Sequence, residues 1–317
     1  MRGNAGSGPR ESQFSQGSQD PGLAEALVVW GLVAVVGLSV LLTYSLVDPD
    51  GLYNVSHDGL AGGASRLLVF LNFPVALMAI AVLALVTDRL GTRWPSLVAL
   101  ALCLVILVPG VVDQDDLDAQ WINILPALGV AIVLALTIVA VRAGGVGGAG
   151  SPDGDRVRIA VAAVLAFLAL PWIFAEAGLY IGDVPGLASI FRSKQIFEGH
   201  ASVHLGEHHG FQGLLLVVTA LLLSRELPRM TPTRLRTALA VYLSVMIPYG
   251  IANMANDGWN EQIVERGWAS WQVPDMLRPG LNWAWGLTII AAAAIYFALD
   301  RGALGEEDRS VDHAKRR

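Results

Sequence analysis

Residues 23–47 read LAEALVVWGLVAVVGLSVLLTYSLV, an apolar run whose only charged side chain is Glu25. A helix needs about 20 residues to cross the hydrocarbon core of a bilayer, and this run is long enough. It is also longer than the apolar core of a signal peptide, which spans about 7–15 residues. We therefore expect residues 23–47 to form a first transmembrane helix.

Further apolar runs follow along the chain, and together they predict an all-α, polytopic integral membrane helix bundle of about eight transmembrane helices. The predicted spans are 23–47, 67–87, 95–112, 122–141, 157–181, 211–224, 237–256 and 282–299. The composition agrees, since 54% of the residues are hydrophobic and 15% are charged, whereas soluble domains have about 25% charged residues. We expect one transmembrane domain over 23–299, a disordered cytoplasmic tail over 1–22 and a charged cytoplasmic tail over 300–317.

The basic residues predict the orientation. Sixteen of the 21 Lys and Arg residues fall on one side of the predicted spans, and five fall on the other. The positive-inside rule then places both termini in the cytoplasm. Arginine greatly outnumbers lysine, a bias typical of GC-rich bacterial genomes, so we expect a multi-pass protein of a bacterial plasma membrane.

The same composition excludes several partners and cofactors. No basic cluster is interleaved with aromatic residues, so nucleic acid is not an expected partner. The lipid bilayer is the one partner that the sequence predicts. Cys103 is the only cysteine, which excludes intrachain disulfides and thiolate metal sites.

Residues 198–210 read EGHASVHLGEHHG and contain four of the six histidines. Most of the chain has the pattern of membrane-spanning helices, in which ionisable side chains are costly and usually have a function. On a helix, His200, His204 and His208 would share one face with Glu207, and His209 would point the opposite way. The rise from His200 to His208 would be about 12 Å, too far for one ion. His204 and His208 are therefore the expected metal-binding pair, with His200 outside it or at a second ion.

The spacing resembles two known patterns. His204-Leu-Gly-Glu207-His208 is similar to the His-x-x-Glu-His pattern of inverted zinc peptidases, in which both histidines bind zinc and the glutamate is the general base. The histidine spacing also resembles the histidine boxes of membrane fatty-acid desaturases and hydroxylases. The first resemblance implies zinc, with Glu207 as the catalytic base. Imidazole and carboxylate ligands would also suit iron or copper.

Two carboxylates could complete such a site. Glu176, in the stretch LPWIFAEAGLY over 170–180, has only apolar and aromatic neighbours, so it should be neutral, paired or bound to a cation. Asp257 belongs to a polar stripe at the end of the seventh predicted span, which also contains Asn253, Asn256 and Glu261. Either feature could instead hydrogen-bond a neighbouring helix.

Three functions agree with these features. The first is a membrane metalloprotein with its site at the extracytoplasmic face, in particular a zinc-dependent hydrolase. The second is an ion or solute transporter with Glu176 and the polar stripe along its path. The third is a non-enzymatic membrane module that binds a lipid or a protein, with the histidines as a pH-responsive patch.

Overall fold

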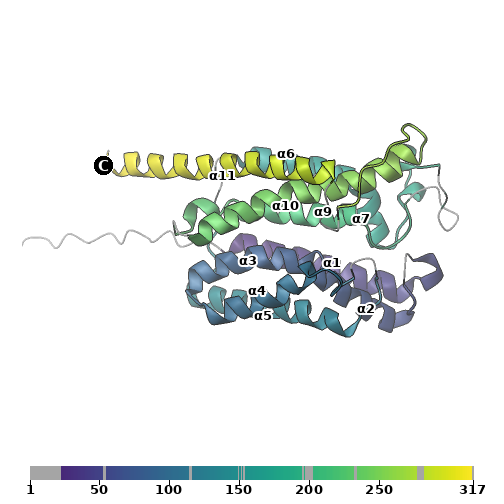
Figure 1. Ribbon diagram of the computed structural model, residues 1–317, viewed down its shortest axis with the longest axis horizontal. Helices are drawn as coiled ribbons and strands as arrows, with labels where there is room; N and C mark the ends of the chain where they lie inside the picture. Colours follow the sequence, from purple (N-terminus) through teal and green to yellow (C-terminus); the bar gives the residue numbers. More distant parts are fainter. Residues whose placement is uncertain are drawn as a thin grey trace, which may run out of the picture.

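The computed structural model describes residues 23–315, apart from 53–54, 114–115, 149, 151, 153, 195, 197–202, 232–233 and 277–281 (Figure 1). The expected N-terminal tail over 1–22 lies outside this part of the chain. All regular elements of the described residues are helical, so the all-α prediction is confirmed there. The longer helices are α1 (Ala24–Leu46), α2 (Gly59–Asn72), α3 (Val75–Leu90), α4 (Trp94–Cys103), α5 (Ile124–Gly144), α6 (Asp155–Leu168), α7 (Leu170–Glu176), α9 (His209–Leu223), α10 (Arg234–Trp259) and α11 (Trp283–Lys315).

Shorter helical turns connect or extend these helices. They are η1 (Pro49–Gly51), η2 (Leu104–Leu107), η3 (Trp121–Asn123), η4 (Ile181–Asp183), α8 (Ala188–Phe191), η5 (Leu227–Arg229) and η6 (Asn260–Val264). Of these, η6 is a π-helical turn that continues α10.

Each of the eight predicted spans coincides with a helix or with a consecutive pair of helices. Within the described residues, four helical segments are long and apolar enough to cross a membrane, namely 24–46, 121–144, 209–229 and 234–264. Two bent pairs raise this number to six: α2 with α3, bent by 48°, and α6 with α7, bent by 65°. The apolar helices over 94–107 and 283–299 are shorter, so a count of eight stays a prediction.

The two bends coincide with proline residues, which lack the amide hydrogen that a continuous helix requires. Pro74 lies in the break between α2 and α3. Pro171 occupies the first turn of α7, directly after the break at Ala169. The second predicted span, 67–87, is therefore two helices, the first of which begins at Gly59.

The helices form two halves that pack against each other (Figure 1). One half contains α1 to α5, and the other contains α6, α7, α9, α10 and α11. Helices α1 and α3 of the first half contact α9 of the second, and α3 also contacts α10. The buried apolar side chains of both halves form one continuous core.

Within the second half, α9 and α10 cross at a contact between two glycines. A methyl group on Gly213 would lie 2.3 Å from the carbonyl oxygen of Gly250, and one on Gly250 would lie 2.5 Å from that of Gly213. Small residues allow helix backbones to approach this closely. The crossing brings the first turn of α9 beside the last turns of α10.

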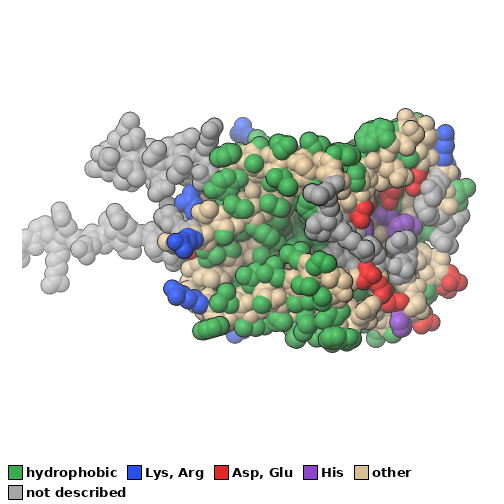
Figure 2. Space-filling model, in the orientation of Figure 1, with side chains coloured by type: hydrophobic (Ala, Val, Ile, Leu, Met, Phe, Trp, Pro, Cys, Tyr) green, Lys and Arg blue, Asp and Glu red, His purple; other side chains and the backbone are tan. Residues whose placement is uncertain are grey.

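Charged side chains divide between the two ends of the bundle (Figure 2). We call the first the arginine end. There Arg225 pairs with Glu25 and with Asp155, at 3.1 Å in both cases, and joins the starts of α1 and α6 to the end of α9. Acidic and histidine side chains gather mainly at the opposite end, which we call the histidine end. An apolar surface lies between them.

Candidate metal centre

The histidine segment does not form the helix that its spacing suggested. Residues 203–208 are non-helical, and α9 begins at His209. Gly206 has φ +99°, a left-handed conformation that interrupts any helix, and Leu205 forms a β-bridge with Leu52. The prediction of one shared helical face is therefore wrong for His204 and His208. His200 lies outside the described residues.

The non-helical segment is attached to both halves of the bundle. Gly206 N–H donates to the carbonyl of Ala175 at 3.1 Å, and Glu207 N–H donates to the Tyr44 hydroxyl at 2.8 Å. A methyl group on Gly206 would lie 2.3 Å from the same hydroxyl oxygen. Position 206 therefore requires glycine, because of its left-handed backbone conformation and because the Tyr44 hydroxyl lies so close.

This attachment brings two histidines and a glutamate together. The rings of His204 and His208 are stacked, with centroids 4.1 Å apart and planes 21° from parallel. His204, His208 and Glu261 each offer one ligand atom, and these atoms lie within 4.8 Å of one another. Two nitrogens and one carboxylate oxygen are donors that zinc prefers.

Backbone carbonyls determine which nitrogen of each histidine can bind an ion. Nδ1 of His204 lies 3.0 Å from the carbonyl oxygen of Leu205, and Nε2 of His208 lies 3.0 Å from that of His204. Because a carbonyl oxygen only accepts, both of these nitrogens carry hydrogen. The lone pair of each neutral ring is then on the other nitrogen, Nε2 of His204 and Nδ1 of His208. Hydrogen bonds of this kind orient metal-binding histidines.

The two acidic residues near the histidines are also oriented by hydrogen bonds. Glu261 places Oε1 3.1 Å from Nδ1 of His208, and its Oε2 accepts a hydrogen bond from Nε1 of Trp172 at 2.7 Å. Asp257 has Oδ2 3.9 Å from Nδ1 of His208, and this oxygen accepts from Gly210 N–H at 2.6 Å. Nδ1 of His208 therefore faces two carboxylates.

The polypeptide geometry of α10 sets the position of Glu261. Asp257 lies in the last regular turn of α10, and Glu261 lies four residues later in the π-helical turn η6. Residues four apart share a helix face, so both acids approach the histidine segment. Single π-helical turns are frequent at functional sites.

Burial keeps the two imidazoles neutral. Burial, together with the neighbouring His208, lowers the pKa of His204 to about 4. Burial also lowers the pKa of His208, although the charge of Asp257 acts in the opposite direction. At pH 7 both rings are therefore in the form that can bind a metal ion.

The other two carboxylates that the sequence singled out lie in a separate group around Arg66. Glu207, expected as the catalytic base, has Oε2 2.7 Å from a guanidinium nitrogen of Arg66, and both side chains are buried. The Arg66 guanidinium also lies 5.5 Å from the centre of the Tyr44 ring. The buried side chain of Glu176 experiences the charges of both Arg66 and Glu207. We call these four residues the Arg66 cluster.

The structure thus unites three of the sequence-predicted residues, His204, His208 and Asp257, and adds Glu261 and Trp172. Glu261 had a sequence signal, because it follows Asp257 by one helical turn in the polar stripe. No sequence signal pointed to Trp172, because its indole lies on α7, outside both the histidine segment and the polar stripe. The amides of the stripe serve packing instead: Asn253 donates to the carbonyl of Tyr249 at 2.9 Å, and Asn256 to that of Val273 at 2.8 Å.

Comparison with protein-family models, with curated proteins and with solved structures finds no match to this chain. The function is therefore inferred from the fold and the geometry of the site.

Proposed function

We propose that this chain is an integral membrane protein whose histidine end binds one divalent metal ion, with zinc as the preferred ion, through His204, His208 and Glu261. The observation that carries the proposal is the orientation of the three ligands. Each has one polar atom that contacts a neighbouring group, and each offers one ligand atom within 4.8 Å of those of the other two. Such outer hydrogen bonds typically accompany metal ligands.

The surface of the bundle supports a membrane location. Large apolar side chains on several helices are widely exposed, for example Val35 at 69% and Ile289 at 66%. In water such a surface would be unfavourable, whereas lipid chains would cover it. We assign the arginine end to the cytoplasm by the positive-inside rule, which places the metal site at the extracytoplasmic face of a plasma membrane.

The ligand set favours a hydrolytic site. Two histidines and one glutamate would hold a zinc ion and leave one of its coordination positions open, as in catalytic zinc sites. Zinc lowers the pKa of a water molecule in such a position to about 7. We give the role of base to Asp257, because it lies beside His208, whereas Glu207 is paired with Arg66.

Metal analysis of detergent-purified protein tests the site. We expect about one zinc ion per chain in the wild type and less than about a tenth of that in His204→Ala/His208→Ala, because one glutamate alone does not hold zinc. His57→Ala is the matched control, since His57 is exposed and bonds Asp118 at 3.0 Å. A wild type without stoichiometric metal, or equal losses in both variants, would contradict the proposal.

The same protein preparation can be used to test whether the bound ion has an open coordination position. Cobalt(II) replaces zinc in such sites and absorbs visible light according to its coordination. Azide should change the spectrum of the cobalt-loaded wild type by displacing the bound water. A spectrum that azide leaves unchanged would indicate a structural ion with no open coordination position. The hydrolase assignment would then be wrong, whereas the metal-site assignment would remain valid.

Trp172→Phe tests the outer hydrogen bond to Glu261. The phenyl ring keeps most of the packing but cannot donate, so we expect zinc affinity to fall about 10–100-fold. The measurement is a titration of metal-free protein in competition with a chromogenic chelator. Trp259→Phe is the control, because its indole donates to the carbonyl of Trp271 at 2.9 Å, outside the ligand set. Equal affinities in the two variants would exclude this role for Trp172.

A further inference from the structure

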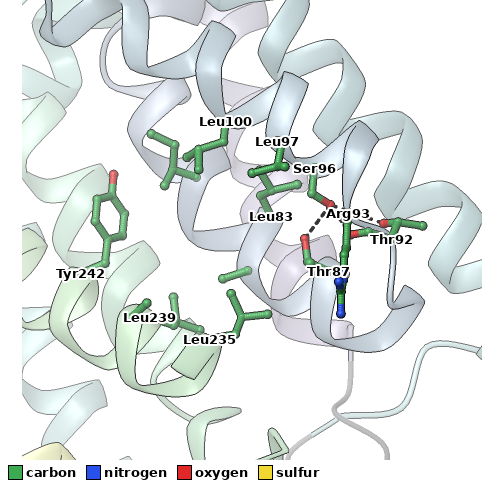
Figure 3. Close-up of a pocket in the computed structure, with 13 residues that line it drawn as sticks. Leu83, Thr87, Thr92, Arg93, Ser96, Leu97, Leu100, Leu235, Leu239 and Tyr242 are labelled. Atoms are coloured by element: carbon green, nitrogen blue, oxygen red, sulfur yellow. Dashed lines mark hydrogen bonds between the residues drawn. The ribbon is translucent and has the colours of Figure 1, made fainter. Parts of the chain in front are cut away.

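A cavity of about 460 Å³ lies between α3, α4 and α10 (Figure 3). Eight of its thirteen lining residues are aliphatic, among them Leu83, Leu97, Leu100, Leu235 and Leu239. Tyr242 also lines the cavity, and its hydroxyl donates to the carbonyl of Leu77 at 2.9 Å, so it already has a partner. The inner part of this groove is therefore apolar, and its size falls in the range of ligand pockets.

The polar lining residues gather at one end of the groove (Figure 3). Thr87 donates to the Ser96 hydroxyl at 2.8 Å, and Ser96 donates to the carbonyl of Thr92 at 3.0 Å. These bonds tie the end of α3 to the start of α4. Arg93 extends beside them from the short connection between the two helices.

The mouth of the groove is positively charged. Arg93 is exposed, and no carboxylate of the described residues pairs with it. Arg234 and Arg236 flank the lining residue Leu235 in the first turn of α10, and the ion pairs of the described residues do not include them either. Asp88 lies at the same end, where it accepts from Thr231 N–H at 3.4 Å. Arg93 is therefore the one charged residue among the described residues that line the groove, and none of these lining residues is acidic.

We propose that this groove binds an acyl chain of an anionic glycerophospholipid from the cytoplasmic leaflet, with the phosphate at Arg93. Basic pockets between membrane helices on the cytoplasmic side are suited to anionic lipid headgroups. The proposal depends on the membrane location of the chain and not on the metal site. Because the bilayer core and the groove are both apolar, moving an acyl chain from one to the other changes its free energy little. The contact with the headgroup must therefore decide which lipid binds.

Native mass spectrometry of the detergent-solubilised full chain tests this assignment. The probe is an equimolar mixture of dioleoyl phosphatidylglycerol and dioleoyl phosphatidylcholine, which differ in headgroup charge and share the same chains. We expect the wild type to retain about fivefold more of the anionic lipid, the factor typical of one basic residue at a charged surface. Arg93→Gln should bring the ratio close to one.

Two further variants separate the headgroup from the chain. Ala84→Phe places a ring in the groove and should reduce binding of both lipids while the metal content of the histidine end stays unchanged. Arg142→Gln, at the exposed end of α5, should keep the wild-type ratio. The proposal is overturned if Arg93→Gln retains the wild-type ratio or if Ala84→Phe binds both lipids as the wild type does. It is also overturned if the wild type is a dimer that Ala84→Phe dissociates, because a second copy of the chain would then cover the groove.

Discussion

Arg66→Met is expected to lower the stability of the folded protein by about 3–5 kcal/mol, because it removes one partner of a buried ion pair. The Arg66 guanidinium and the Glu207 carboxylate are 2.7 Å apart, and their side chains are 1% and 5% exposed. Without the cation, the negative charges of the buried Glu207 and Glu176 would repel each other with no attraction to Arg66 to offset the repulsion. The measurement is the temperature at which heated, detergent-solubilised protein loses its monodisperse elution peak.

Two other variants show whether the charge is responsible. Arg66→Met/Glu207→Gln should recover part of the lost stability, since it removes both charges of the pair. Arg192→Met, at an exposed position of the same end, should melt like the wild type. If Arg66→Met melted at the same temperature as Arg192→Met, the ion pair between Arg66 and Glu207 would not stabilise the fold.

Gly213→Ala is expected to destabilise the protein by about 1–3 kcal/mol, the usual cost of overpacking. The added methyl group would meet the backbone carbonyl of Gly250 at 2.3 Å, and a backbone atom cannot move aside as a flexible side chain can. Helices α9 and α10 would have to separate, which would also move Asp257 and Glu261 away from His208. Lower melting temperature and weaker zinc binding should therefore appear together.

Gly31→Ala is the matched control for this substitution. Gly31 lies within α1, and nothing lies within 4 Å of a methyl group placed on it. Alanine is favoured over glycine inside helices by up to about 1 kcal/mol, so this variant should melt at the wild-type temperature or above it. If Gly213→Ala and Gly31→Ala both raised or both lowered the melting temperature, the result would argue against a close crossing of α9 and α10.

The helices were predictable because their apolar runs are long and their charges are confined to the connections. Breaks within the runs were less predictable: proline recurs in several spans, and only the packing shows that α2 and α3 bend at Pro74. The sixth predicted span, 211–224, corresponds to α9, which begins two residues earlier, at His209 inside the histidine segment.

The candidate site was predictable in part. The pairing of His204 with His208 follows from a spacing of four, yet the contact arises from an extended segment, because Gly206 adopts a positive φ beside Tyr44. A helical projection also placed Glu207 with the histidines, whereas the structure pairs it with Arg66. No pattern within one segment could identify a partner that comes from another helix, and this applies equally to Trp172.

The attachment of the histidine segment also has a consequence for biogenesis. Tyr44 and Arg66 precede the segment in the chain, whereas Glu261 is synthesised after it, so the ligand set is complete only when α10 has entered the bundle. An ion that binds the completed set and not the partial one would shift the folding equilibrium toward the assembled state, in proportion to its free concentration relative to its dissociation constant. If the chain binds metal as proposed, metal occupancy would distinguish fully assembled copies from those in which the last helices had failed to join the bundle.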